Sequence, residues 1–130
     1  MQTETLSVLA VDDNEYNRDL IARYLKRQGH QVTLAEDGVE ALDLLGSQRF
    51  DIILLDLMMP RMDGFEVLTR LQADPALRDI PVIVISAMTD TDKLLQCIKL
   101  GAQDYLFKPL HSEYLKARLK ACMEKRMMAA

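Results

Sequence analysis

The sequence predicts a single α/β domain in which a five-stranded parallel sheet carries helices on both faces. Five short apolar segments rich in β-branched residues alternate with segments whose apolar residues recur at helical spacing. Short connections between such segments are typical of parallel sheets with right-handed crossovers. At 130 residues the chain has room for one domain, so we expect residues 1–130 to form one unit with its core at about residues 6–125.

The third apolar segment is the best defined strand. Residues 52–55 are four branched apolar residues that lead directly into Asp56, so this strand is expected in the middle of the sheet, buried on both faces. The other strands are expected at residues 6–11, 31–35, 82–85 and 104–107.

Capping residues mark where the helices begin and end. Asn14 is a suitable N-cap for a helix over residues 15–28, and Gly29 suits the left-handed position that follows it. Further helices are expected over residues 39–46, 65–74, 91–100 and from 112 onward. The last helix can continue into a coiled-coil linker if the chain is part of a longer protein, because it carries an apolar stripe of Leu115, Leu119, Cys122 and Met123.

Composition and charge argue against a membrane or nucleic-acid partner. The 16 basic and 20 acidic residues give a net charge of −4, so no overall positive charge favours nucleic acid. No apolar run approaches the ~20 residues that span a bilayer, and the amino terminus lacks a secretory pattern. We expect a soluble, cytoplasmic protein, in which Cys97 and Cys122 are reduced and His30 and His111 are solvated loop residues.

Reactive side chains stand at the carboxyl ends of four predicted strands. Asp12 and Asp13 follow the first strand, Asp56 ends the third, Ser86 follows the fourth and Lys108 follows the fifth. In an open parallel sheet these ends meet at one edge, where ligands bind. A lone acid at a strand end, such as Asp56, more often caps a turn. Three neighbouring carboxylates, however, repel one another, and a hard divalent cation such as Mg²⁺ would offset this repulsion. One acid then remains as a nucleophile, and the set fits phosphoryl transfer to a carboxylate.

Other phosphate chemistries fit the residues less well. A flavin mononucleotide carrier would place a phosphate next to the first strand, where Asp12 and Asp13 would repel it. A phosphohydrolase with an aspartyl nucleophile typically has a second acid two residues further on as proton donor, and this position is Met58. None of the glycines precedes a Lys-Ser or Lys-Thr pair, so no P-loop is present in the sequence.

Four stretches of the sequence resemble the receiver domain of two-component response regulators, in residue type, order and spacing. They are Val11-Asp12-Asp13-Asn14, Asp56 with Met59-Pro60-Arg61-Met62-Asp63-Gly64, Ser86-Ala87, and Gly101-Ala102-Gln103-Asp104-Tyr105-Leu106-Phe107-Lys108-Pro109. The resemblance covers nearly the whole chain. It implies the flavodoxin-like doubly wound fold of chemotaxis regulators, with five helices, a sheet of strand order 2-1-3-4-5 and the second strand at its edge. It also implies a cis bond before Pro109.

The same resemblance assigns the phosphoacceptor and the metal ligands. It implies that Asp56 accepts the phosphoryl group and takes part in holding Mg²⁺. Asp13 would bind the ion directly, Asp12 would bind it through water, and the backbone carbonyl of Met58 would be a further ligand.

The remaining roles implied by the resemblance concern the phosphoryl group and the output. Ser86 and Lys108 would hold the phosphoryl oxygens, and Tyr105 would turn with Ser86 as the switch. A histidine kinase or histidine phosphotransfer protein would be the donor. The face of the fourth helix, fifth strand and last helix, about residues 91–120, would meet a downstream protein, an output domain or a second copy as a phosphorylation-dependent homodimer. The chain would then be no enzyme beyond its own phosphotransfer and dephosphorylation. The alternative is a degenerate receiver that acts as a scaffold without phosphorylation.

Two methionines flank the expected path of the water that hydrolyses the acyl phosphate. Met58 lies two residues beyond Asp56, and Met88 lies two residues beyond Ser86. Neither side chain can hydrogen-bond the attacking water strongly, so we expect both to slow the loss of the phosphoryl group.

Overall fold

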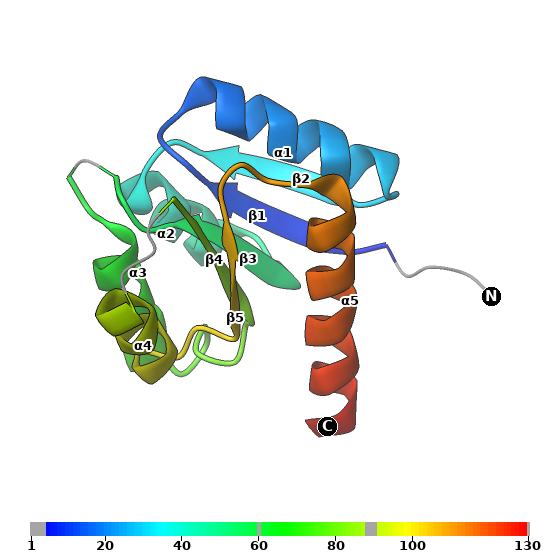
Figure 1. Ribbon diagram of the computed structural model, residues 1–130. Helices are drawn as coiled ribbons and strands as arrows, with labels where there is room; N and C mark the ends of the chain where they lie inside the picture. The colour runs from blue at the N-terminus through cyan, green and yellow to red at the C-terminus, as the bar shows by residue number, and fades with distance from the viewer. Residues whose placement is uncertain (1–4, 60, 88–90, 130) are drawn as a thin grey trace.

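The five predicted strands form one parallel sheet in the order β2-β1-β3-β4-β5 (Figure 1). The computed structural model describes residues 5–59, 61–87 and 91–129, with side chains up to residue 125. The strand order implied by the resemblance is therefore confirmed, including the edge position of the second strand. The strands are β1 (Ser7–Val11), β2 (Gln31–Ala35), β3 (Ile52–Asp56), β4 (Val82–Ser86) and β5 (Asp104–Phe107).

Five helices cover the two faces of the sheet. They are α1 (Glu15–Arg27), α2 (Gly38–Ser47), α3 (Gly64–Ala73), α4 (Thr91–Lys99) and α5 (Ser112–Ala129). Buried residues of α1 and α5 share one apolar cluster with the sheet, and those of α2, α3 and α4 share the other. The flavodoxin-like doubly wound arrangement is thus confirmed (Figure 1).

Strand β3 is the buried centre of the sheet. All five of its residues are buried, with Ile52 and Leu54 in the cluster of α1 and α5, and Ile53 and Leu55 in the opposite cluster. Each such side chain contributes roughly 1.5–3 kcal/mol by leaving water. Asp56 therefore ends a strand whose position is fixed by packing on both faces.

Residues at the two ends of α1 determine where this helix begins and ends. The Asn14 side chain accepts a hydrogen bond from the Asn17 backbone N–H at 3.0 Å, as expected for the N-cap of α1. Gly29 has a φ of 87°, which confirms its left-handed position after α1. Because β1 ends at Val11 and α1 is capped at Asn14, only two residues separate them, and both are aspartates.

His30 departs from its prediction as a solvated residue. Its ring is partly buried, and Nδ1 accepts a hydrogen bond from the Leu6 backbone N–H at 3.1 Å. Burial lowers the pKa of His30, so the neutral ring serves as an acceptor at the start of β1. The sequence pattern gave no sign of this contact, since Leu6 lies 24 residues away. His111, by contrast, is exposed as predicted.

The apolar stripe of α5 packs within the domain. Leu115, Leu119 and Cys122 are buried against the sheet. Cys97 is buried on the opposite side, and both cysteines are free thiols. Since the stripe is used by the core, a coiled-coil continuation would need other residues. Among the residues that the structure describes, no helix is both long and apolar enough to cross a bilayer.

Candidate functional site

Three carboxylates lie together at the carboxyl ends of β1 and β3. Val11 pairs with Leu55 in the parallel ladder, so the residues that follow, Asp12 and Asp56, are neighbours. These two residues are 1% and 3% exposed, while Asp13 is exposed beside them. One carboxylate oxygen from each of the three residues lies within 4.8 Å of the other two. The predicted convergence of these acids is therefore observed.

Lys108 brings a positive charge to this cluster from the end of β5. Its Nζ lies 3.1 Å from Asp12 Oδ2 and 3.4 Å from Asp56 Oδ1. The Lys108 backbone N–H donates to the Ser86 carbonyl at 3.0 Å, which fixes the ends of β4 and β5 to each other. The peptide bond between Lys108 and Pro109 is cis, as the resemblance implied. One ammonium thus lies within ion-pair distance of two of the three carboxylates.

The loop after β3 is held close to Asp56. The Gly64 backbone N–H donates to the Leu57 carbonyl at 2.9 Å, and a Cβ at Gly64 would lie 2.7 Å from the Asp56 carbonyl oxygen. Glycine is therefore required at this close approach. Arg61, which has a φ of 66°, forms an ion pair with Asp37 at the N-cap of α2. These two contacts hold the loop that carries Met58.

The acidic surroundings alter the protonation of Asp56. Burial, followed by the nearby charge of Asp12, raises the pKa of Asp56 to about 6, although Lys108 acts in the opposite direction. The carboxylate is thus less stable in its ionised form than an exposed aspartate. A cation bound beside it would favour the ionised form that a nucleophile needs.

The donor set fits a magnesium ion. Asp12 Oδ2 is buried, and although Lys108 Nζ lies within ion-pair distance, none of the described residues donates a hydrogen bond of regular geometry to it. A buried carboxylate oxygen without such a donor is costly unless a cation or a water molecule satisfies it. Mg²⁺ prefers carboxylate and water oxygens and needs only one or two carboxylates from the protein.

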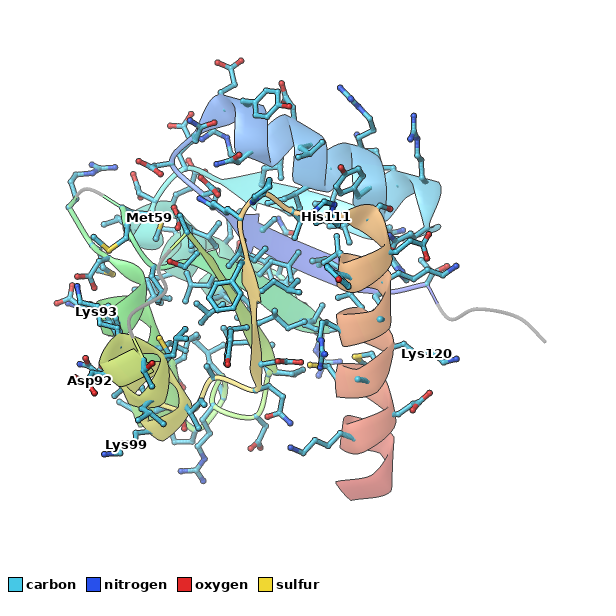
Figure 2. All side chains as sticks on the ribbon, in the orientation of Figure 1. Met59, Asp92, Lys93, Lys99, His111 and Lys120 are labelled. Atoms are coloured by element: carbon cyan, nitrogen blue, oxygen red, sulfur yellow. The ribbon has the colours of Figure 1, made fainter. Side chains whose placement is uncertain are left out.

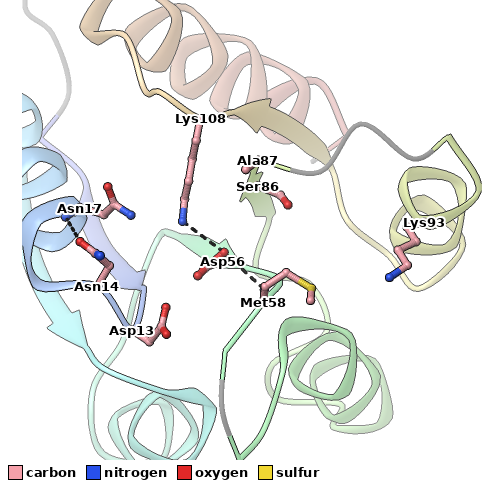
Figure 3. A pocket seen from close by; sticks show the side chains of 9 residues that line it. All are labelled: Asp13, Asn14, Asn17, Asp56, Met58, Ser86, Ala87, Lys93 and Lys108. Atoms are coloured by element: carbon pink, nitrogen blue, oxygen red, sulfur yellow. Dashed lines mark hydrogen bonds and ion pairs between the residues drawn. The ribbon is translucent and has the colours of Figure 1, made fainter.

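A pocket of about 530 Å³ opens above the carboxylates (Figure 3). Five residues predicted or implied as site residues are among those that line it, and Asp12 lies beside it through its contact with Lys108. Tyr105 does not line this pocket; it is partly buried and lies edge to face with Phe107. Met88 lies outside the described residues. The lining residues are Asp13, Asn14, Asn17, Asp56, Met58, Ser86, Ala87, Lys93 and Lys108.

Three polar residues of the pocket were not predicted as site residues. The capping pattern predicts only a helix cap at Asn14, although its position next to Asp13 is a signal that it faces the site. Asn17 lies three residues later on the same helix and could have been inferred from Asn14. Lys93 comes from α4, and its position at the pocket depends on how that helix packs, for which the sequence offers no local signal.

The sheet order and the acidic pocket at its carboxyl edge define a doubly wound α/β domain with three clustered carboxylates at the strand ends. The chain belongs to the response regulator receiver domain family, whose model matches residues 8–120.

Similar proteins include signalling proteins from several bacteria. Response regulator MprA of Mycobacterium sp. (strain KMS) is 41% identical over 118 residues, which is 91% of this chain and 50% of that protein. The chain therefore spans about half the length of the curated relatives it matches. The chemotaxis protein CheY4 of Vibrio cholerae has a TM-score of 0.86 and 32% identity, covering 91% of this chain and 98% of that one. The receiver domain of the sensor histidine kinase PA1611 from Pseudomonas aeruginosa PAO1, solved with a magnesium ion in its active site cleft, has a TM-score of 0.83 and 31% identity, covering 91% and 97%.

Proposed function

We propose that this chain is a phosphorylation-activated signalling switch whose phosphoacceptor is Asp56. The supporting observation is the cluster of Asp12, Asp13 and Asp56 with Lys108 at the edge of an open pocket. A carboxylate oxygen of Asp56 attacks the phosphorus of the donor, the bond from phosphorus to the donor atom breaks, and its electron pair leaves with the donor. The product is an aspartyl phosphate.

Each neighbouring residue has a role in this transfer. Mg²⁺, when bound, supplies positive charge that offsets the carboxylates and the phosphoryl oxygens. We propose Asp13 as its direct ligand, Asp12 as a ligand through water, and the Met58 carbonyl as a further ligand beside Asp56. In addition, Ser86 and Lys108 are proposed to bind the phosphoryl oxygens. Lys108 is already placed between two of the carboxylates, so it can move from Asp56 to the phosphoryl group with little reorganisation.

The transfer is tested by incubating the protein with Mg²⁺ and acetyl phosphate and measuring intact mass. We expect one added phosphoryl group on the wild type and none on Asp56→Asn. The exposed carboxylate of Asp19, on α1, offers a matched control, because Asp19→Asn should be modified like the wild type. Labelling that persists in Asp56→Asn would reject Asp56 as the phosphoacceptor. No labelling of the wild type would favour a scaffold that works without phosphorylation.

The output is proposed to pass through the face formed by α4, β5 and α5, about residues 91–120. This face exposes large apolar side chains from all three elements, which is typical of a protein contact surface. We propose that Ser86 moves toward the phosphoryl group and that Tyr105 then turns inward, so the modified and unmodified forms favour different arrangements of the face. The exposed apolar residues are Leu95, Ile98, Phe107 and Tyr114.

Amide spectra of the two forms test this switch. Phosphorylation is expected to shift backbone amide signals across residues 91–120, whereas signals of residues 39–47, on α2, should shift less because α2 packs chiefly against β1, β2 and α3. The variant Tyr105→Ala should weaken the shifts beyond β5. Identical spectra across residues 91–120 in both forms would reject the switch.

The partners of the switch are proposed from the family and the pocket. The phosphodonor would be a histidine kinase or a histidine phosphotransfer protein. The partner bound by the α4-β5-α5 face would be a downstream protein, an output domain or a second copy of this chain. We place the reaction in the cytoplasm. Two free cysteines that are both buried agree with a reducing compartment.

The lifetime of the aspartyl phosphate is proposed to depend on Met58 and Met88. Met58 lines the pocket and is 59% exposed, which supports a position beside the approach of a hydrolytic water; Met88 lies outside the described residues. Because neither thioether orients water strongly, Met58→Asn should speed loss of the phosphoryl group by roughly two- to tenfold, the effect of one added hydrogen bond. Adding Met88→Gln should speed it further. The loss is followed by intact mass after the donor is removed.

Met58→Leu is the matched control for this measurement, because it keeps an apolar side chain of similar volume. It should dephosphorylate at the wild-type rate. An unchanged or slower loss in Met58→Asn would show that Met58 does not set the lifetime.

A further inference from the structure

Lys93 contributes a second ammonium group to the pocket, from a different side than Lys108. It lies in the first turn of α4 and lines the same pocket as Asp56, Met58 and Ser86 (Figure 3). The Lys93 side chain is exposed and forms no ion pair with any residue that the structure describes. Lys108, in contrast, is already within ion-pair distance of two carboxylates. Lys93 is therefore a pocket cation that is not in an ion pair with any described residue.

When Mg²⁺ and a phosphodonor are both bound, the site has more negative than positive charge if Lys93 is not counted. Three carboxylates, one ammonium and one divalent cation together sum to about zero. A phosphodonor such as acetyl phosphate adds about two negative charges, and none of the groups already counted remains to offset them. Lys93 is positioned at the pocket to supply part of the missing positive charge.

The position of Lys93 on its helix adds to this argument. The first turn of a helix favours negative charge, so a lysine there does not stabilise α4. Lys99, at the other end of the same helix, is where the helix dipole favours a cation (Figure 2). The N-terminal end of α4 and the Lys93 ammonium thus both favour an anion at this side of the pocket, and Asp92 in the same turn opposes them in part.

The geometry of phosphoryl transfer indicates which part of the donor Lys93 meets. The attacking and leaving oxygens are roughly in line through the phosphorus, so the leaving group lies on the side away from Asp56, toward the pocket opening. Lys108 contacts Asp56 itself, at the base of the pocket. Lys93 extends from the helix beside the opening and is not tied to the base (Figure 3).

We propose that Lys93 binds phosphodonors with an anionic leaving group, namely acyl phosphates, and stabilises the carboxylate that departs when Asp56 is phosphorylated. This inference rests on the proposed function of Asp56. In the step, the Asp56 oxygen bonds to phosphorus, the bond between phosphorus and the acyl oxygen breaks, and the acyl carboxylate leaves with the electron pair next to Lys93. A donor whose leaving group is neutral gains less from Lys93.

Two small donors and four proteins test the proposal. Rates of phosphorylation by acetyl phosphate, whose leaving group is acetate, and by phosphoramidate, whose leaving group is ammonia, are measured by intact mass with saturating Mg²⁺. Lys93→Gln should lower the acetyl phosphate rate about two- to fivefold, as expected for one solvent-exposed charge contact, and the phosphoramidate rate less. Lys93→Arg should retain the wild-type preference between the donors. Lys99→Gln, on the same helix but away from the pocket, should behave as the wild type.

Salt and metal affinity separate this role from a structural one. The difference between wild type and Lys93→Gln should shrink at about 1 M salt, where the Debye length is near 3 Å. The Mg²⁺ affinity, measured by calorimetry, should stay the same. Equal slowing with both donors, or no slowing in Lys93→Gln, would overturn the role of Lys93 while leaving Asp56 as phosphoacceptor. A wild type that neither donor modifies would instead reject the proposed function and Lys93 with it.

Discussion

Phosphorylation of Asp56 is expected to slow by at least about 100-fold when Mg²⁺ is removed, because several kcal/mol of charge stabilisation is lost. Asp12, Asp13 and Asp56 lie within 4.8 Å of one another, and the approaching phosphoryl group adds further negative charge. Lys108 alone cannot offset this charge, since it already faces two of the carboxylates. The rate is measured by intact mass with acetyl phosphate, with Mg²⁺ or with an excess of chelator.

Asp13→Ala should reproduce most of this loss even with Mg²⁺ present. Asp13 is exposed, so its removal leaves no buried cavity and the fold should be retained. Asp19→Ala, an exposed acid on α1, is the matched control and should keep the wild-type rate. Rapid phosphorylation of the wild type in chelator would mean that the acids do not act through a metal.

The sequence predicts the base of the site well because strand ends are determined locally. The apolar run before Asp56 fixes a buried strand, and the Asn14 cap leaves only Asp12 and Asp13 in the preceding loop. Parallel strands then bring these carboxylates to one edge without further information. The strand order, however, came from the resemblance to receiver domains and not from hydrophobic periodicity.

The remaining features depend on contacts between distant elements. Lys93 reaches the pocket through the packing of α4. Similarly, His30 accepts a hydrogen bond from Leu6, and Arg61 pairs with Asp37, 24 residues away in each case. No local pattern predicts these contacts, since a lysine on a helix or a histidine in a loop is most often solvated. These contacts form only when the distant elements pack together in the folded chain.

The clustering that makes Asp56 a suitable nucleophile should also cost the folded protein stability. Burial and the charge of Asp12 disfavour ionised Asp56, and Lys108 only partly compensates. Neutralising this one side chain should therefore stabilise the metal-free domain, even though it removes the proposed function. Such a trade-off between the stability of the fold and the function of a residue is typical of functional sites.

Asp56→Asn is expected to raise the free energy of unfolding at pH 7.5, without Mg²⁺, by up to about 3 kcal/mol. The pKa of Asp56 is raised from 3.8 to about 6 on folding. Between these values the folded chain holds a proton that the unfolded chain has lost, so wild-type stability falls as the pH rises through this window, and the loss is complete above about pH 6. Asparagine stays neutral and avoids this loss. Urea unfolding of both proteins from pH 3.5 to 7.5 measures the difference, which should be largest at pH 7.5 and shrink toward pH 3.5.

Mg²⁺ provides the second arm of this experiment. Mg²⁺ should stabilise the wild type more than Asp56→Asn at pH 7.5, because the ionised Asp56 helps to bind the ion. The difference in the free energy of unfolding between the two proteins should therefore become smaller. Asp19→Asn, which neutralises an exposed acid, should change stability by less than about 0.5 kcal/mol at any pH in the series. A gain for Asp56→Asn that is the same at pH 3.5 and pH 7.5 would mean that packing, and not the buried charge of Asp56, accounts for it.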